Sequence, residues 1–331
     1  MQTNTTPAED KPAPLTIMDM VFQKENRISS KGIGLIICYI ELFLFILVTP
    51  SIMKQVWPIV LNFIDSNGFS HNLVYLVGLI IWHLIWWCIY QGSMWFVYHI
   101  EHPFFEKHKI SDSPWPWNEN KEEWVKKVKK SLMIQMFNFV FGPILIVGAD
   151  LWMNKNVQFS FRSEDMPNSL ILICQLIFLL IMEDLGFYFF HKLSHHRLLY
   201  PHFHKFHHNF VNTVSISAEH FHPVDFFLGV LIPGSFGPIV LGNNLHFATY
   251  LIWIAFRTGE GVDGHCGYEF PWSMFRLIPF SASASYHDFH HSHNIGNYSS
   301  FLSIWDSVFG DNAAYIEFQR EQEKTKKAKT L

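Results

Sequence analysis

Four long apolar stretches constrain the fold of this chain more than any other feature of its sequence. They occupy approximately Ile33–Val48, Leu73–Tyr98, Leu132–Trp152 and Leu170–Phe190. A bilayer core of roughly 30 Å requires about 20 apolar residues per helix, so the last three stretches are long enough and the first is marginal but adequate. The composition agrees, since 49% of the residues are hydrophobic and only 16% are charged. The sequence therefore predicts an all-helical membrane protein with about four spanning helices.

A fifth apolar region, Phe226–Phe256, is interrupted by proline, glycine and asparagine residues. Broken backbone is tolerated at membrane depth only where protein or water satisfies the freed polar groups. We therefore interpret residues 226–256 as a re-entrant or interfacial hairpin and not as one full span. Such a hairpin keeps the segments before and after it on the same side of the membrane.

Basic residues are distributed unevenly among the connecting segments. The N-terminal tail and the connection 99–131 are rich in lysine and arginine, whereas the other two connections hold only Lys54, and Lys155 with Arg162. By the positive-inside rule, both termini and the region after the fourth span face the cytosol. The polar start of the chain argues against a cleaved signal peptide. The net charge of -4 gives no reason to expect a nucleic acid as partner.

Fifteen of the twenty histidines fall between His191 and His293. Residues three and four apart lie on one face of a helix, and three histidine clusters have this spacing. The spacing directs eight imidazoles toward a common centre. These are His191, His195, His204, His207, His208, His287, His290 and His291.

Eight imidazoles exceed what one four-coordinate ion can use, so the clusters imply two metal ions. An imidazole-rich set suits iron, copper, zinc or nickel better than magnesium or calcium. A histidine-rich storage tract is the alternative, but such tracts lack regular spacing. Because substrates dissolved in a bilayer present mostly inert C–H bonds, dioxygen chemistry at paired iron fits better than hydrolysis.

Three aspartates near the clusters are candidates to hold the imidazoles in place, namely Asp184, Asp288 and Asp306. A ligating imidazole normally donates its other N–H to a carboxylate or a carbonyl. Asp184 and its neighbour Glu183 lie near the end of an apolar helix, where ionisable groups are costly unless they are paired. A helix-capping or salt-bridge role is the alternative for each aspartate.

Around these residues the chain resembles the fatty acid hydroxylase and sterol desaturase superfamily, and most closely its C-4 methylsterol oxidase branch. The resemblance extends from about Glu183 to Asp311. It departs at His220, where that branch usually has an aromatic residue, and at Asn209, where an acidic residue is common. The segments that carry the resemblance are 183–191, 204–208, 218–223, 262–272, 286–291 and 296–310.

The resemblance implies a dioxygen-dependent monooxygenase of the endoplasmic reticulum membrane with two iron ions. Electrons would come from NAD(P)H through cytochrome b5 or its reductase. It also implies further histidine ligands, for which His265 is the first candidate and His222 the second, while the role of His196 stays open.

The expected reaction is oxidation of a sterol C-4 methyl group in sterol biosynthesis. A C-24 sterol de-alkylase and a fatty-acyl or sphingolipid hydroxylase are alternatives within enzymes. A catalytically idle metal-binding or sterol-sensing membrane protein is the alternative outside them. Lys327 and Lys329 stand fifth and third from the end and resemble a cytosolic retrieval signal for the endoplasmic reticulum.

We expect four parts along the chain. They are a cytosolic N-terminal tail (1–32), a transmembrane bundle (33–190) with a cytosolic connection (99–131), a catalytic histidine-box region (191–311) that includes the hairpin 226–256, and a basic C-terminal tail (312–331).

Overall fold

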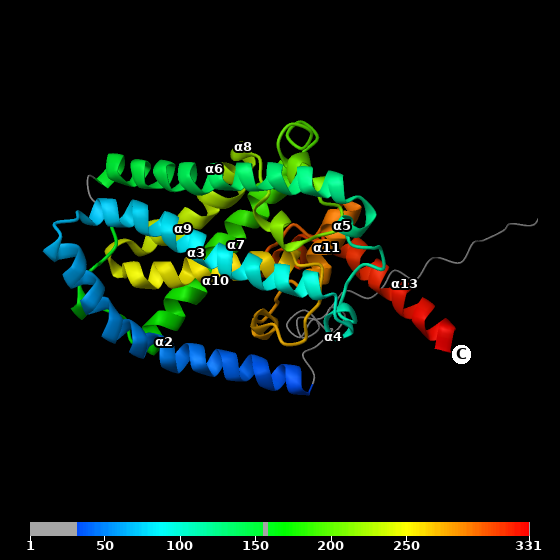
Figure 1. The fold of residues 1–331 in the computed structure, drawn as a ribbon, viewed down its shortest axis with the longest axis horizontal. Helices are drawn as coiled ribbons and strands as arrows, with labels where there is room; N and C mark the ends of the chain where they lie inside the picture. Colours follow the sequence, from blue (N-terminus) through cyan, green and yellow to red (C-terminus); the bar gives the residue numbers. More distant parts are fainter. Residues whose placement is uncertain (1–31, 155–157, 331) are drawn as a thin grey trace, which may run out of the picture.

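The computed structural model describes residues 32–154 and 158–330, and these residues are almost entirely helical (Figure 1). They form no strand, only isolated bridges. The all-helical fold class is therefore confirmed, while nearly all of the expected N-terminal tail and the side chain of Lys329 lie outside the described part. The longer helices are α2 (Ile33–Ser66), α3 (His71–Ile100), α6 (Lys121–Asn154), α7 (Ser169–Ser194), α9 (Ile232–Leu241), α10 (Phe247–His265), α11 (Ala284–His293) and α13 (Ala313–Thr330).

Short helices and tight helical turns connect these elements. The short helices are α4 (Pro103–Glu106), α5 (Pro116–Glu119), α8 (Pro223–Phe226) and α12 (Ile304–Phe309). The 3-10 turns are η1 (Ser163–Asp165), η2 (His204–Asn209), η3 (Ser215–Glu219), η5 (Gly242–Asn244) and η6 (Met274–Leu277), and η4 (Phe227–Leu231) is a π-helical turn.

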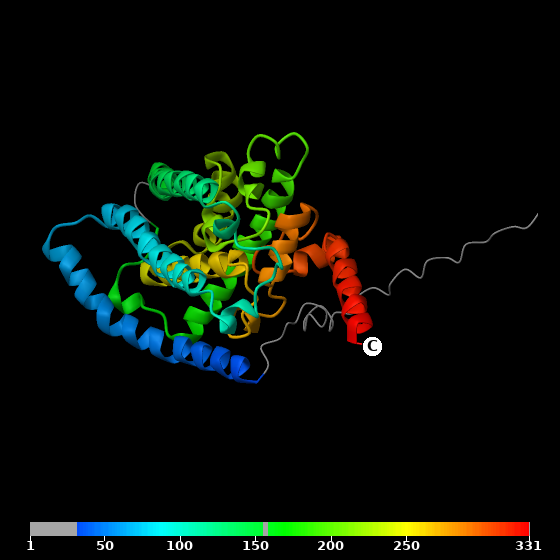
Figure 2. The ribbon, with the colours of Figure 1, turned by 45° about the vertical axis from the view of Figure 1, so that its right-hand side comes forward.

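All four predicted spans lie inside long helices, and the first helix is much longer than expected. The apolar stretch that was predicted to end at Val48 continues in α2 through Pro50 and Pro58 to Ser66. Each internal proline removes one backbone hydrogen bond and bends a helix without having to end it. Figure 2 shows α2 curving along the outside of the other helices.

Outward faces of the long helices carry large apolar side chains. Phe43 is 62% exposed, Ile59 70% and Met133 75%. A soluble protein rarely exposes so much contiguous apolar surface, whereas hydrocarbon tails solvate it well. Five helical segments are long and apolar enough to cross a bilayer, namely α2, α3, α6, α7 and the run Pro223–Asn244. These features indicate a multi-pass membrane protein.

The region 226–256 forms a helical hairpin, but its first arm is not broken as expected. Helix α8, the π-helical turn η4 and α9 follow one another directly, and Pro233 lies in the first turn of α9. The proline removes one backbone hydrogen bond where the π-helical turn passes into α9, without ending the helical run. The reversal falls at Gly242, which has a positive φ of 50°, and α10 then returns.

Close packing of α7 against α9 explains one glycine on each of these helices. A Cβ atom at Gly237 would lie 2.7 Å from Leu179 Cδ2, and one at Gly186 would lie 2.8 Å from a ring carbon of Phe236. Small residues allow membrane helices to approach each other closely. The glycines therefore serve helix packing and do not break the helices.

The hairpin brings the chain back to the end of the bundle from which it started. In Figure 1, α7 and α10 both end near α11, whereas the α2–α3 turn, the C-terminal end of α6 and the α9–α10 turn lie at the opposite end. The start of α2 and the C-terminal helix α13 are also at the α11 end. All three histidine clusters consequently gather at one end of the bundle.

Candidate metal centre

The first histidine cluster closes α7. His191 lies in its last turn and His195 is the C-cap residue. The Nδ1 of His191 donates to the carbonyl oxygen of Tyr298 at 2.6 Å, which leaves Nε2 with a free lone pair. That Nε2 lies 3.1 Å from Nε2 of His204, and Nε2 of His195 lies 3.1 Å from Nε2 of His290. Imidazoles from all three clusters therefore meet directly.

The second cluster lies on the 3-10 turn η2 and not on the α-helix that its spacing suggested. Residues three apart on a 3-10 helix lie one above the other, about 6 Å apart along the axis. His204 and His207 can therefore serve two neighbouring positions. His208 lies beside His204, with their Nε2 atoms 3.2 Å apart.

The third cluster lies on α11, as predicted, and it contributes to both positions. Nε2 of His287 lies 2.9 Å from Nε2 of His265, at the end of α10. The His291 ring stacks on His208 and lies edge-on to His207, with ring centroids 4.6 Å away in both cases.

The eight cluster histidines and His265 together form two groups in which one nitrogen of each residue lies within 4.8 Å of the others. Each group has the residue types and proximity to hold a metal ion. His265, expected as an extra ligand, is a member, whereas His222 and His196 belong to neither group. His222 instead caps α8, and its Nδ1 accepts the N–H of Val224 at 3.2 Å. The first group is His191, His195, His204, His208 and His290, and the second is His207, His265, His287 and His291.

The spacing of these nitrogens fits metal coordination. A zinc–imidazole bond is about 2.1 Å long, so two imidazole nitrogens on one such ion lie about 3.0 to 3.4 Å apart for angles between about 90° and 109°. The closest Nε2 pairs lie 2.9 to 3.2 Å apart. Neutral imidazoles have only one N–H each, so several of these pairs cannot all be hydrogen bonded at once.

Buried nitrogens without partners point the same way. Nε2 of His291 and Nδ1 of His207 are buried and have no hydrogen-bond partner among the described residues. Burial lowers the pKa of His207, His287, His290 and His291 well below the usual value, and neighbouring histidines lower it further. Neutral imidazole is the form that binds a metal.

Backbone carbonyls hold several of the rings in place. Nδ1 of His290 donates to the Gly296 carbonyl at 2.6 Å, and Nδ1 of His265 to the Gly261 carbonyl at 2.8 Å. Such bonds fix the tautomer and leave Nε2 available to a metal. Gly296, whose carbonyl accepts from His290, has a positive φ of 61°, a backbone conformation that glycine adopts readily.

The carboxylate that holds a cluster imidazole is Asp225, which the sequence interpretation missed. Its Oδ2 lies 2.8 Å from Nδ1 of His204, and its Oδ1 accepts a hydrogen bond from Ser194 at 3.1 Å. An acidic residue at the start of an apolar helical run could have signalled this role, because ionisable groups are costly there.

The three aspartates that were predicted to hold imidazoles accept hydrogen bonds from backbone N–H groups. The segments that donate these bonds in turn lie close to the imidazoles. Asp306 accepts the N–H of Tyr298 at 2.8 Å, and Asp184 accepts N–H groups of residues 300–302. The carbonyl of Tyr298 in turn accepts from His191. Both carboxylates therefore shape the loop that orients this imidazole.

Asp288 acts in a similar indirect way. It accepts hydrogen bonds from the backbone N–H and the hydroxyl of Thr213, at 3.0 and 2.7 Å. The neighbouring carbonyl of Phe210 accepts Nδ1 of His291 at 2.9 Å. Among the described residues, the three predicted aspartates hydrogen bond to backbone N–H groups and to other side chains, and not to an imidazole. Their spacing in the sequence could not distinguish an imidazole from a backbone N–H as the partner.

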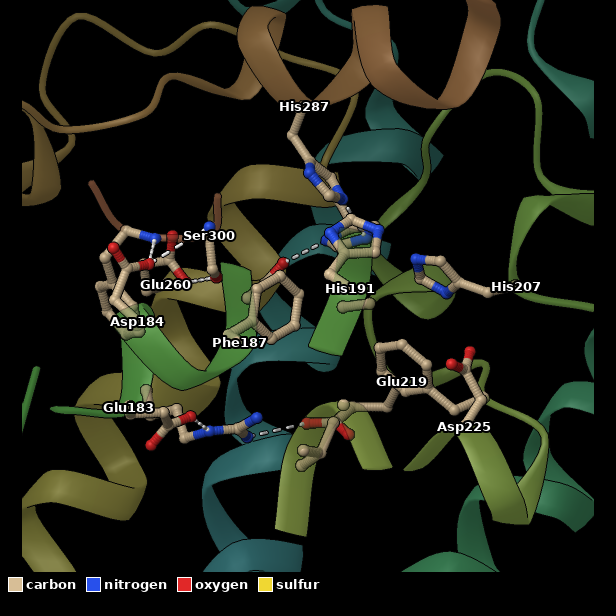
Figure 3. Close-up of a pocket in the computed structure, with 18 of the residues that line it drawn as sticks. Glu183, Asp184, Phe187, His191, His207, Glu219, Asp225, Glu260, His287 and Ser300 are labelled. Atoms are coloured by element: carbon tan, nitrogen blue, oxygen red, sulfur yellow. Dashed lines mark hydrogen bonds and ion pairs between the residues drawn. The ribbon is translucent and has the colours of Figure 1, made fainter. Parts of the chain in front are cut away.

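A pocket extends from the two groups of imidazoles into the bundle (Figure 3). His191, His207 and His287 stand at one end of it, while Glu183 and Glu219 lie at the other. Phenylalanine and valine side chains line much of the space between, so the pocket is largely apolar apart from its two ends. The pocket therefore provides a confined space beside the candidate metal centre.

Comparison with known proteins gives consistent results. Residues 176–311 match the model of the fatty acid hydroxylase family. The chain is 33% identical over 223 residues to methylsterol monooxygenase 1 of Gallus gallus, a match that covers 67% of this chain and 72% of the relative. It is 34% identical over 215 residues to methylsterol monooxygenase 1 of Danio rerio, which covers 64% and 70%.

A fungal relative shows a similar degree of sequence identity. The chain is 33% identical over 230 residues to the C-4 methylsterol oxidase of Candida albicans, a match that covers 68% of this chain and 71% of the relative. No solved structure matches significantly. The resemblance found in the histidine clusters is confirmed.

Proposed function

Because the chain belongs to the fatty acid hydroxylase family, we propose that it oxidises a C-4 methyl group of a membrane sterol with dioxygen. The chain is an oxidoreductase by family, and the relatives named methylsterol monooxygenase and C-4 methylsterol oxidase support this substrate. The single observation that carries the proposal is the convergence of nine histidines into two groups at one end of a lipid-facing bundle.

The two histidine groups would each hold one iron ion. His191, His195, His204, His208 and His290 form the site of the first ion, and His207, His265, His287 and His291 that of the second. When bound, a pair of irons supplies the activation of dioxygen that oxidation of an inert C–H bond requires. The chain itself keeps these imidazoles neutral by burial and fixes their orientation through Asp225 and the carbonyls of Tyr298, Gly296 and Gly261.

The pocket excludes water and orients the substrate. His191, His204 and Phe187 lie along it, and Phe221 closes part of its wall. A largely apolar lining holds a lipid by area burial, and the few polar groups at its ends set the orientation. Successive oxidation of one methyl group would carry it through an alcohol and an aldehyde to a carboxylate.

Location and electron supply follow from the same proposal. The lysine-rich start of α6 lies at the α11 end of the bundle (Figure 1), and basic segments favour the cytosolic side. We therefore infer a protein of the endoplasmic reticulum whose metal centre and termini face the cytosol. Electrons would reach the irons from NAD(P)H through cytochrome b5 or its reductase. The catalytic region would be residues 191–311, and the bundle 33–190 would anchor it.

Lipid profiling of a strain that lacks this protein tests the substrate. We expect 4-methyl sterols to accumulate in this strain. They should disappear when the wild-type gene is restored, and they should persist when a gene that encodes His207→Ala is introduced instead. Accumulation of 24-alkyl sterols or of unhydroxylated acyl chains would instead identify one of the alternative enzymes. An unchanged lipid profile, with metal still bound to the purified protein, would point to a non-catalytic role.

A further inference from the structure

A second pocket adjoins the one beside the imidazoles. It lies between α3, α6, α9 and α10, and Glu183, Val230 and Arg257 line both pockets. Most of its remaining lining is apolar and faces the membrane-embedded part of the bundle. These apolar lining residues include Leu79, Phe139, Ile146, Leu231, Trp253 and Ile254. A polar group therefore lies where an apolar pocket between the helices meets the pocket of the candidate metal centre.

The polar group consists of Arg257 between two carboxylates. Glu183 is fully engaged, because it accepts hydrogen bonds from Arg257 Nε and from Trp253 Nε1, the latter at 3.1 Å. Glu219 is not. Its Oε1 lies 3.9 Å from Arg257 Nη1 and 3.7 Å from Nε2 of His83, and both distances are too long for a hydrogen bond.

Two buried atoms at this junction lack partners. Oε2 of Glu219 and Nε2 of His83 have no hydrogen-bond partner among the described residues, although the Glu219 side chain is only 7% exposed. Buried polar atoms are rarely left unpaired in native proteins, so such atoms mark the place of a missing polar group. Glu219 lines the pocket beside the imidazoles, and His83 lines the apolar pocket.

The charges favour a neutral ligand group over an anion. Arg257 already balances Glu183, and a ligand carboxylate would add further negative charge beside Glu219. Burial raises the pKa of Glu219 to about 7, although Arg257 opposes the shift. At neutral pH its carboxyl group can therefore either donate or accept a hydrogen bond. A hydroxyl group, which can do both, is the complementary partner.

We propose that Glu219, supported by Arg257 and His83, binds the ring hydroxyl of a sterol whose apolar ring system approaches from the side of the apolar pocket. This inference rests on the proposed function. In a sterol, the carbon that bears the ring hydroxyl is the neighbour of C-4. Holding the hydroxyl at the junction therefore places the C-4 substituents beside the pocket that leads to the imidazoles, and it selects this carbon over others on the skeleton.

Equilibrium binding to the full-length protein in lipid nanodiscs tests the proposal without any need for turnover. The ligands are a 4-methyl sterol and its 3-deoxy analogue, and the variants are Glu219→Leu and Glu219→Gln. A site built to hydrogen bond a hydroxyl rejects an analogue that lacks it. The wild-type protein should therefore bind the hydroxyl-bearing sterol at least about 10-fold more tightly than the deoxy analogue.

The variants test whether Glu219 causes the preference for the hydroxyl-bearing sterol over the deoxy analogue. In Glu219→Leu the preference should largely disappear, because affinity for the sterol falls while affinity for the deoxy analogue is retained. Glu219→Gln, which keeps a donor and an acceptor, should restore much of it. The matched controls Glu164→Leu and Glu164→Gln change an exposed glutamate that pairs with Arg162 on the α6–α7 connection, and they should keep the wild-type preference.

Several results would overturn the proposal. The first is equal affinity of the wild-type protein for the two ligands. The second is a Glu219→Leu variant that keeps the preference for the hydroxyl-bearing sterol, or that loses affinity for both ligands equally. Tighter binding of a long-chain fatty acid than of the sterol would show that the junction takes a carboxylate. Failure of the wild-type protein to oxidise 4-methyl sterols would refute the proposed function separately, because the binding measurement does not depend on turnover.

Discussion

Asp225 lies 2.8 Å from Nδ1 of His204, and both side chains are at most 3% exposed. The carboxylate accepts a hydrogen bond from the Nδ1–H of His204, so Nε2 of His204 stays free and lies close to Nε2 of His191 and His208. A carboxylate on the far nitrogen of a ligating imidazole fixes its orientation and raises its basicity. This pair connects the start of the α8–α9 run with the candidate metal centre.

Replacing Asp225 by Asn should lower metal affinity or activity roughly 10 to 100-fold, because such outer partners typically contribute that much. Metal content of the purified variant, measured by elemental analysis during titration with a chelator, provides the readout. Asp65→Asn is a matched control, since Asp65 faces His71 at 3.7 Å in an exposed pair. Equal chelator resistance of Asp225→Asn and the wild-type protein would contradict this role.

His265 and His222 should differ sharply when each is replaced by Ala. His265 belongs to the second histidine group, whereas His222 caps α8. We expect His265→Ala to lose bound metal and almost all turnover, and His222→Ala to keep its metal with a loss of stability of about 1 kcal/mol, typical of a helix cap. Retention of full metal content in His265→Ala would remove this residue from the site.

His220 should make the stability of the protein depend on pH. Burial, together with the nearby charges of Lys127 and Lys130, lowers its pKa to about 3. Below the unfolded pKa of about 6.5 the unfolded chain takes up a proton that the folded protein does not, so stability is complete above pH 6.5 and falls as the pH drops toward 3. At pH 5 the loss from this group is of the order of 1 to 2 kcal/mol.

Thermal unfolding of His220→Phe tests the effect. The ring of His220 stacks on Phe206 with centroids 4.1 Å apart, so phenylalanine can preserve that contact, although it loses the hydrogen bond to Ser131. The drop in Tm between pH 7 and pH 5 should be smaller in this variant than in the wild-type protein, whereas the exposed control His71→Phe should show the wild-type drop. An identical drop in both variants would count against the assignment.

The topology predicts which ends of the helices face the lumen. Asn154 ends α6 at the end of the bundle opposite to α11, whereas Gly310 follows α12 near the metal centre. A glycosylation acceptor inserted near Asn154 should be glycosylated, and one inserted after Gly310 should not. Glycosylation after Gly310 would contradict a cytosolic metal centre.

Much of the site follows from spacing in the sequence. Histidines three and four apart on a helix share a face, and a chain that leaves and re-enters the same end of the bundle must bring the clusters together. His265 was the one extra ligand candidate that the structure places in a group. The 3-10 form of η2 could not be anticipated, because its histidine spacing is compatible with either helix type.

The hydrogen-bond partners were harder to predict than the imidazoles. Asp184, Asp288 and Asp306 accept hydrogen bonds from backbone N–H groups, whereas Asp225, 21 residues after His204, contacts its imidazole directly. Which polar group an aspartate meets depends on tertiary packing, and the sequence pattern does not encode it. The long course of α2 was missed for a similar reason, since packing and lipid sustain a helix through internal prolines.

Metal stoichiometry of the purified full-length protein is the most direct test of the two-ion centre. The arrangement predicts two ions per chain, with content reduced in both His290→Ala, which removes a member of the first group, and His291→Ala, which removes one of the second. Zinc in place of iron would be consistent, because affinity alone favours zinc over ferrous iron. One ion per chain in fully loaded, active protein would contradict the account.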